Sequence, residues 1–215
     1  METEQDYAPR SAFDPADGVF VAQLRRPADL RDVSFETLSP LLRALLVIDG
    51  TVTKFLEAYA LEPITVRRLG QSSRILDTDD PWLCAAAGER IIVRHVMLVG
   101  GESGRLYTYA ESLIVPSRLS LQMQGRLETE SGGLGKILLD SALETRREGL
   151  WYGREQLADL PGPVGELCDG DFLLRSYRII AGGAPLMRIT ERFPMPSNSV
   201  ASFGRAPGQT RHPGS

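Results

Sequence analysis

The chain has 215 residues, of which 42% are hydrophobic, and this suits one domain with a sizeable core. Its formal net charge of -4 and the lack of a Lys/Arg stripe interleaved with aromatic residues argue against a nucleic acid partner. The longest apolar runs are far shorter than the ~18 residues of a membrane span, and the acidic start is not a signal peptide, so we expect a cytoplasmic protein without a membrane partner.

Both ends of the chain lack an apolar periodic pattern. Residues 1–18 are polar, and residues 196–215 are rich in Ser, Gly and Pro, so we predict two disordered tails around a domain at 19–195. Near the start of that domain, Ser39-Pro40 has the form of a helix N-cap followed by a first-turn proline. The apolar face of this predicted helix ends near Gly50.

A second helix follows at once, with Thr51 as its predicted cap. Its apolar stripe has helical spacing and contains Val52, Phe55, Leu56 and Tyr59. Further helices are predicted at 118–127 and 134–143, and Gly132-Gly133 forms the break between them.

The pattern beyond Pro63 is that of strands joined by hairpins. The predicted strands are 64–69, 90–99, 105–115, 144–152, 171–180 and 186–193. Strands in hairpins, with helices gathered before and between them, indicate the α+β class. We therefore predict a single antiparallel sheet of about six strands with covering helices.

Two opposite charges lie in these strands on faces that are otherwise apolar. Because side chains alternate along a strand, Glu191 shares a face with Met187, Ile189 and Phe193. By the same count Arg94 lies with apolar neighbours. A buried charge costs several kcal/mol (roughly) unless it is paired or meets a ligand. The two residues therefore predict either a site for a small polar molecule or a buried structural bridge, in which they pair with each other or with neighbours.

Other motifs carry less chemistry. The stretch Gly132-Gly133-Leu134-Gly135-Lys136 resembles a phosphate loop, but Ile137 stands where Ser or Thr must reach magnesium, and no strand directly precedes it. A flexible entry into a helix explains it better. Two cysteines without close spacing and two histidines give no metal site and no Ser-His-Asp triad, so we predict no metal ligands.

The order of five segments resembles the chorismate pyruvate-lyase family. These segments are Leu46 to Lys54, Val93 to Leu98, Ala110 to Pro116, Gly133 to Lys136 and Ile189 to Phe193. Members of this family cleave chorismate to 4-hydroxybenzoate and pyruvate without metal or cofactor. The resemblance therefore implies an enzyme with a small-molecule substrate, an aromatic product and no cofactor.

The resemblance also implies roles for particular residues. The family arginine that binds the ring carboxylate matches Arg94, and the glutamate that faces the ring hydroxyl matches Glu191. Substrate-binding positions match Leu134 beside Gly133, and Val52 beside Thr51 on a helix that covers the pocket.

The segment Tyr-Ala-Glu-Ser at 109–112 places this chain nearer the actinobacterial and archaeal branch of the family, and adds Glu111 as a substrate-binding candidate. Ubiquinone-branch members carry methionine in place of Val52 and an Arg-containing segment in place of Ala110-Glu111-Ser112. A pocket of different shape and charge is therefore expected here.

Two alternatives to a chorismate lyase stay open. The same fold serves as the effector-sensing module of some transcription regulators, which favours a non-catalytic binder of cyclic or aromatic acids. Residues 1–37 are too short and too acidic for the DNA-binding domain of such a regulator. The other alternative is a biosynthetic-cluster enzyme that acts on a different cyclic acid.

Overall fold

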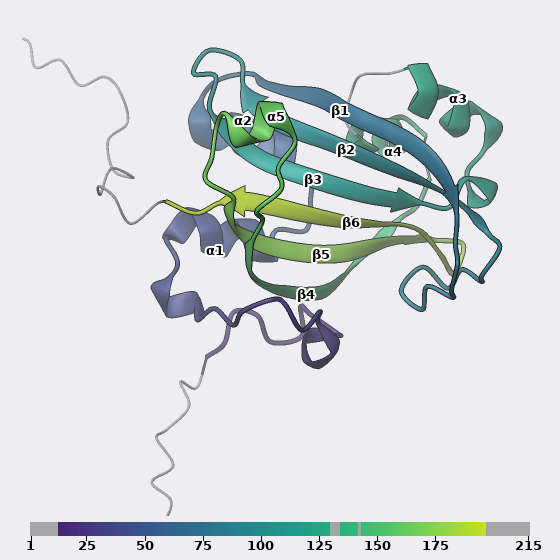
Figure 1. The fold of residues 1–215 in the computed structure, drawn as a ribbon, viewed down its shortest axis with the longest axis horizontal. Coiled ribbons are helices and arrows are strands. Elements are labelled where there is room, and N and C mark those ends of the chain that lie inside the picture. Colours follow the sequence, from purple (N-terminus) through teal and green to yellow (C-terminus); the bar gives the residue numbers. More distant parts are fainter. Residues whose placement is uncertain (1–12, 130–133, 142, 197–215) are drawn as a thin grey trace, which may run out of the picture.

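A six-stranded antiparallel sheet forms the frame of the protein in a computed structural model, which describes residues 13–129, 134–141 and 143–196. The strands lie in the order β1-β2-β3-β6-β5-β4 (Figure 1), and each neighbouring pair is antiparallel. Their bounds are β1 (Ile64–Ile75), β2 (Arg90–Gly100), β3 (Leu106–Ile114), β4 (Arg146–Gln156), β5 (Asp171–Ala181) and β6 (Ala184–Pro194). The predicted fold class is confirmed.

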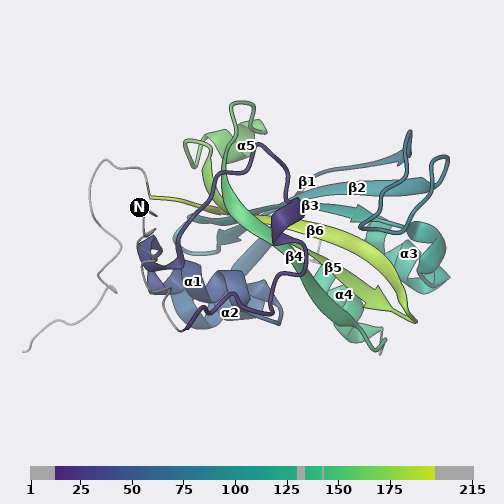
Figure 2. The same ribbon diagram turned by 90° about the horizontal axis from the view of Figure 1, so that it is seen from below.

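Four helices cover one face of this sheet, and a single-turn helix lies on the opposite side (Figure 2). The covering helices are α1 (Pro40–Val47), α2 (Val52–Ala60), α3 (Leu121–Thr129) and α4 (Leu134–Asp140); the single turn is α5 (Gly162–Gly165). Short 3-10 turns stand at Gln23–Arg25, Phe35–Thr37 and Pro116–Arg118. Apolar side chains of α1 and α2 form one core with the sheet, and those of α3 and α4 form another.

The two helices before the sheet begin differently. The hydroxyl of Ser39 accepts a hydrogen bond from the backbone N–H of Leu42 at 3.3 Å, which confirms the predicted cap of α1. Thr51 occupies the cap position of α2 without making a side-chain cap bond, so the predicted capping role was wrong. Its side chain lies instead against α4, where a Cβ on Gly135 would come within 3.2 Å of Thr51 Cγ2.

Several elements differ in extent from their predicted bounds. β1 continues to Ile75 and β4 to Gln156, because their polar second halves remain in register with β2 and β5. The helix predicted from residue 118 begins only at Leu121, after the 3-10 turn. Gly132 and Gly133 lie outside the described residues, as do most of the two predicted tails.

The hairpin between β5 and β6 sets the register on which the site depends. Gly182 and Gly183 both have positive φ, +57° and +80°, a conformation that suits glycine in a two-residue turn. The resulting register places Arg175 of β5 opposite Glu191 of β6. Two charged residues far apart in sequence are thereby brought side by side.

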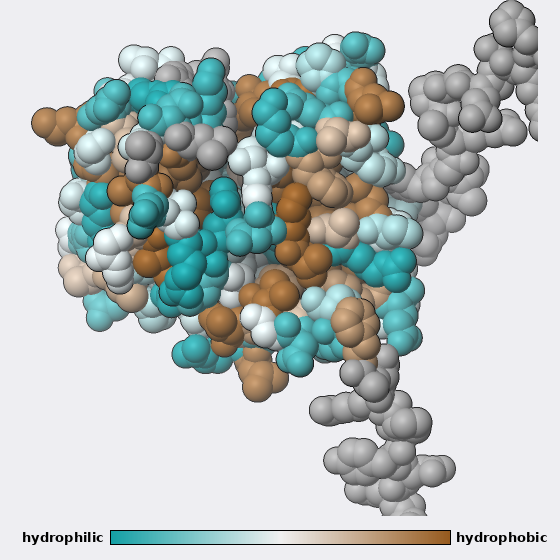
Figure 3. All heavy atoms as spheres, turned by 180° about the vertical axis from the view of Figure 1, so that it is seen from behind, coloured by the Kyte–Doolittle hydropathy of each residue, from teal (hydrophilic) through white to brown (hydrophobic). Residues whose placement is uncertain are grey.

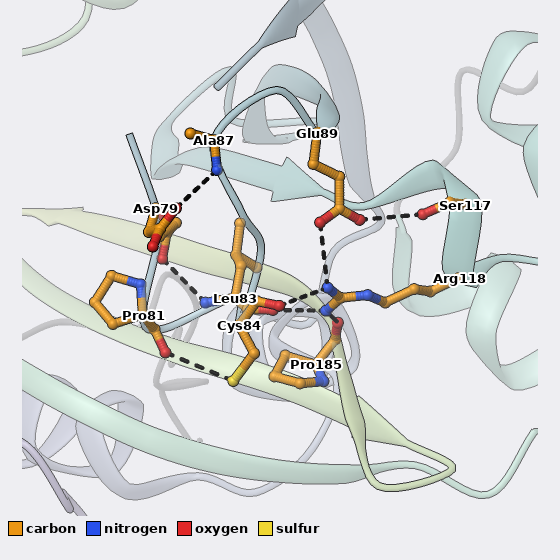
Figure 4. Close-up of polar contacts among 10 residues, drawn as sticks. Asp79, Pro81, Leu83, Cys84, Ala87, Glu89, Ser117, Arg118 and Pro185 are labelled. Atoms are coloured by element: carbon orange, nitrogen blue, oxygen red, sulfur yellow. Dashed lines mark hydrogen bonds and ion pairs between the residues drawn. The ribbon is translucent and has the colours of Figure 1, made fainter. Parts of the chain in front are cut away.

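The connection between β1 and β2 is fastened to the rest of the fold by Arg118 (Figure 4). Its guanidinium donates to the carbonyls of Leu83 and Pro185 at 2.6 Å and of Cys84 at 2.8 Å, and lies 3.6 Å from the carboxylate of Glu89. Because these partners come from different parts of the chain, one side chain holds the connection against the start of β6. The apolar residues of this connection pack on the sheet face away from the helices.

Candidate active site

A cavity of about 80 Å³ lies between the sheet and the covering helices. Figure 3 shows the helix-covered side of the molecule from outside, where hydrophobic residues lie among hydrophilic ones. The cavity is lined by the start of α2, the start of α4 and inward residues of all six strands, among them Val52, Arg94, Thr108, Leu134, Arg147 and Glu191.

Three small side chains on β3 make room for this cavity. Thr108, Ala110 and Ser112 follow one another on the strand face that points toward the helices, and all three line the cavity. Within the described part of the chain, the hydroxyl of Thr108 is buried without a hydrogen-bond partner. Such a group suits contact with a polar ligand, because buried polar groups are normally satisfied.

Arg94 places a buried cation in this cavity from β2. The residue is 1% exposed, and its Nη1 donates to Gln71 Oε1 at 3.0 Å and to the carbonyl of Leu127 at 3.2 Å. Burial, and then the nearby charge of Arg68, lower the pKa of Arg94. An arginine stays protonated in proteins even so, which gives the cavity a fixed positive charge.

Glu191 enters the same cavity from β6, held by two donors of β5. Its Oε2 accepts from Arg175 Nε at 2.8 Å, and its Oε1 accepts from the hydroxyl of Tyr177 at 3.1 Å. Burial, and then the charge of Glu191, raise the pKa of Tyr177, so this phenol keeps its proton and donates it. The carboxylate is thus fixed in orientation at the wall of the cavity.

Arg175 connects this carboxylate to the covering helices. Its Nη1 donates to the backbone carbonyls of Leu46 at 3.2 Å and Ile48 at 2.9 Å, where α1 ends. The sequence analysis missed this residue, although Arg175 shares an inward face with Leu173, Tyr177 and Ile179. That is the same signal by which Glu191 was found.

The structure brings most of the predicted site residues together. Val52, Thr51 and Leu134 line the cavity with Arg94 and Glu191. Arg94 and Glu191 do not form an ion pair with each other. Glu191 accepts a hydrogen bond from Arg175, whereas Arg94 donates to Gln71 and Leu127. The hypothesis that each charge pairs with neighbouring residues therefore describes their hydrogen bonds. The hypothesis of a site for a small polar molecule agrees with the cavity that both residues line.

Two predicted residues do not join this set. Glu111 lies between Ala110 and Ser112 on β3, so alternation turns its side chain to the other face of the sheet, where its carboxylate is 3.8 Å from His95. The substrate contact predicted for Glu111 in this cavity is therefore corrected. Gly133 lies outside the described residues.

In the ranges 13–129, 134–141 and 143–196, His, Cys, Asp and Glu nowhere gather in threes that could hold a metal ion. Over the same ranges, each helix is too short or too polar to cross a membrane.

The architecture is similar to that of solved bacterial structures, among them an effector domain. PhnF from Mycobacterium smegmatis has a TM-score of 0.54 at 10% identity over 69% of this chain and 65% of that one. The effector domain of PhnF alone has a TM-score of 0.53, also at 10% identity, over 67% of this chain and 88% of that domain. At such low identity the likeness shows the fold alone.

Sequence relationships identify the family. Residues 46–200 match the family described as Chorismate pyruvate-lyase Rv2949c-like, and the chain belongs to this family. The chorismate pyruvate-lyase of Mycobacterium tuberculosis is 31% identical over 175 residues, which cover 76% of this chain and 84% of that protein. The enzyme of the same name from Mycobacterium leprae is 34% identical over 158 residues, covering 71% of this chain and 73% of that protein.

Proposed function

We propose that this protein is a chorismate pyruvate-lyase that produces 4-hydroxybenzoate and pyruvate in the described cavity, without a cofactor. The observation that carries the proposal is the placement of Arg94 and Glu191 in the lining of one cavity. Both positions also match the family residues that contact the ring carboxylate and the ring hydroxyl. Membership of the family and relatives at 31% and 34% identity support the same activity.

Arg94 binds the ring carboxylate in this proposal. Its planar guanidinium can donate two parallel hydrogen bonds to a carboxylate, which a lysine ammonium cannot reproduce. The bonds to Gln71 and Leu127 hold the side chain in place before substrate arrives. The surroundings are apolar, with Val96, Ile189 and Leu138 on the cavity wall, so the charge interaction is strengthened by the low dielectric.

Glu191 accepts the hydrogen bond of the ring hydroxyl and assists removal of the ring proton. The proton leaves the ring carbon that bears the hydroxyl, and its electron pair enters the ring as the carbon–oxygen bond to the side chain breaks. The side chain departs as enolpyruvate and takes up one proton at its methylene carbon to become pyruvate. Aromatisation drives the reaction, so positioning and charge stabilisation suffice and no covalent nucleophile is needed.

The helices exclude water from this reaction. Thr51, Val52 and Thr53 open α2 at the cavity, where backbone N–H groups of a first helical turn lack helical acceptors and favour anions. Leu134 and Leu138 of α4 add apolar cover. The ring is thus held in a space where developing negative charge meets fixed donors.

The direct test is to incubate purified protein with chorismate and to measure 4-hydroxybenzoate and pyruvate by chromatography. We expect the two products in equal amounts, formed faster than in buffer, and formed equally well after treatment with a chelator. Products no faster than in buffer would contradict the proposal.

The second candidate function is non-catalytic binding of an aromatic acid, favoured by the fold shared with the PhnF effector domain. Calorimetry separates the two functions. A protein that binds 4-hydroxybenzoate tightly but leaves chorismate intact is a binder, whereas a lyase converts chorismate at the same site.

A further inference from the structure

A second cavity, of about 290 Å³, adjoins the first. Its walls are residues 18–21, the chain from Leu46 to Asp49 between α1 and α2, and the start of β4, together with Arg175 and Tyr177. Arg147 and Tyr177 line both cavities, and therefore stand between them. Neither Arg147 nor this second cavity takes part in the chemistry proposed for Arg94 and Glu191.

Arg147 is the arginine of β4 whose charge is least engaged by the protein. Its Nε is buried and has no hydrogen-bond partner among the described residues. Its ion partner, Asp49, is 3.8 Å away with a side chain 80% exposed, so water competes with this contact. On the same strand, Arg146 lies 3.1 Å from Glu148, and Arg154 Nε donates to Asp171 at 2.7 Å.

The second cavity has another unengaged donor. Arg175 uses Nε and Nη1 for Glu191 and the backbone of α1, but its Nη2 is buried without a partner within the described ranges. Two arginines that line one space, Arg147 and Arg175, thus each have a buried guanidinium nitrogen without a partner in the described residues. Because an unmade bond of a buried cation is costly, this arrangement favours an anion.

The two arginines that line opposite sides of the first cavity come from strands that lie far apart in the sheet. Arg94 lies on β2 and Arg147 on β4, four strand positions apart in the sheet order, so their backbones are about 19 Å apart along the sheet at about 4.8 Å per strand. Both side chains nevertheless line the same cavity. A single carboxylate meets one of these cations, whereas a ligand with two separated carboxylates can meet both.

We propose that Arg147 binds the carboxylate of the three-carbon side chain of the substrate, and that the second cavity receives this fragment when it is released. The inference rests on the proposed function, and assigns the site a preference for dicarboxylates. Ser112, beside Arg94 in the register of β2 and β3, is neutral and short. The second positive charge therefore comes from the β4 side of the cavity.

The experiment compares parent, Arg147→Gln and Arg147→Lys, with Arg74→Gln as the control. Arg74 is an exposed arginine of β1 that lines neither cavity, and its replacement removes the same charge. For each protein we would measure kcat/KM for chorismate and inhibition by 4-hydroxybenzoate and by pyruvate. Melting temperature verifies folding of every variant.

We expect Arg147→Gln to lower kcat/KM for chorismate by about 10- to 100-fold, the range of a lost charge-assisted hydrogen bond, and to remove inhibition by pyruvate. Inhibition by 4-hydroxybenzoate should change less than about twofold, because this acid has only the carboxylate assigned to Arg94. Arg147→Lys should lose less kcat/KM than Arg147→Gln, and Arg74→Gln should match the parent. Arg94→Lys, in contrast, should weaken chorismate and 4-hydroxybenzoate together.

An equal loss of chorismate and 4-hydroxybenzoate affinity in Arg147→Gln, or no loss of either, would overturn the inference. A loss shared by Arg74→Gln would also overturn it, because the general charge of the protein would then be the cause. If the parent binds chorismate without converting it, the proposed function fails. The ratio of chorismate to 4-hydroxybenzoate affinities, measured by calorimetry on parent and Arg147→Gln, then still decides the role of Arg147.

Discussion

Two consecutive residues of β6 form arginine–glutamate pairs on opposite faces of the sheet. Glu191 bonds Arg175 at 2.8 Å on the helix-covered face, and Arg192 bonds Glu155 at 2.6 Å on the other face. Side chains of the first pair are 5% and 9% exposed, and those of the second are both 13% exposed. The chemistry of the two pairs is the same, so their surroundings must account for any difference in role.

The two pairs differ in the groups and the empty space that surround them. The Glu191 pair borders a cavity, has a second donor to Glu191 in Tyr177 and leaves Arg175 Nη2 without a partner in the described residues. On the other face, the Arg192 guanidinium lies over the ring of Tyr109, 5.5 Å from its centroid. The comparison teaches that an inward charge indicates a site where it borders unfilled space, and indicates structure where its neighbours fill the space.

The strongest test of this contrast is Glu191→Gln, which keeps shape but removes the charge and the capacity to take a proton. We expect turnover of chorismate to fall by about 10²- to 10⁴-fold, typical of a lost general base, while 4-hydroxybenzoate binding through Arg94 persists. Turnover and melting temperature measured on the same sample check this. A variant that melts early but turns over normally per folded molecule would show that Glu191 is structural only.

Arg175→Met tests the same pair from its other side. It leaves the carboxylate of Glu191 buried without its cation and frees the carbonyls of Leu46 and Ile48. We expect a loss of about 3–5 kcal/mol in the free energy of unfolding, measured by urea denaturation, because a buried charge loses its partner. A loss below about 1 kcal/mol would place this pair with exposed ion pairs.

Arg192→Gln is the matched change on the other face. We expect a loss of about 1–2 kcal/mol in the free energy of unfolding, between the values for exposed and fully buried pairs. We expect kcat and KM for chorismate to stay at parent values, because Arg192 does not line the cavity. A large fall in kcat with little loss of stability would remove the contrast between the faces.

Glu62 provides a third setting, partly exposed, in which a carboxylate is held by uncharged donors. It accepts from the hydroxyl and N–H of Ser103, from the N–H of Glu102 and from the hydroxyl of Tyr107. These bonds, led by the Ser103 hydroxyl, lower the pKa of Glu62 from 4.5 to about 2. A lowered folded-state pKa contributes stability above the unfolded value that is lost as pH falls through the folded value.

Glu62→Gln should therefore be less stable than the parent above pH 4.5, and the gap should close as pH falls toward about 2. Urea denaturation at a series of pH values checks this. A gap that widens in acid would mean that the pKa of Glu62 is higher in the folded than in the unfolded protein.

Strand alternation predicted the two central residues of the site, and its limits explain what was missed. Arg94 and Glu191 were found because each shares a face with apolar neighbours along its own strand. Arg175 carries the same signal and was overlooked, but its pairing with Glu191 could not be read from either strand, because the register set by the Gly182-Gly183 turn determines it. Pairing between strands depends on turn geometry, which a single strand pattern does not contain.

The remaining differences have local causes. Glu111 was placed at the site through the family segment, although alternation between Ala110 and Ser112 points it to the other face. The capping prediction for Thr51 considered only its own helix, whereas its side chain contacts Gly135 of α4. The fold class was predictable because hairpin turns and apolar periodicity agree along most of the chain.

The small side chains of β3 have a consequence for how this protein can change. The first cavity exists because the side chains of Thr108, Ala110 and Ser112 are small. Their strand, β3, lies in the middle of the sheet and is hydrogen-bonded to a strand on each side. Its backbone is therefore fixed while its side chains remain adjustable. A methylene group added to any of the three side chains would reduce the size of the ring that fits between the sheet and the helices. The rigid strand therefore limits the size of the ligand, whereas the cations at the two sides of the cavity select its charge.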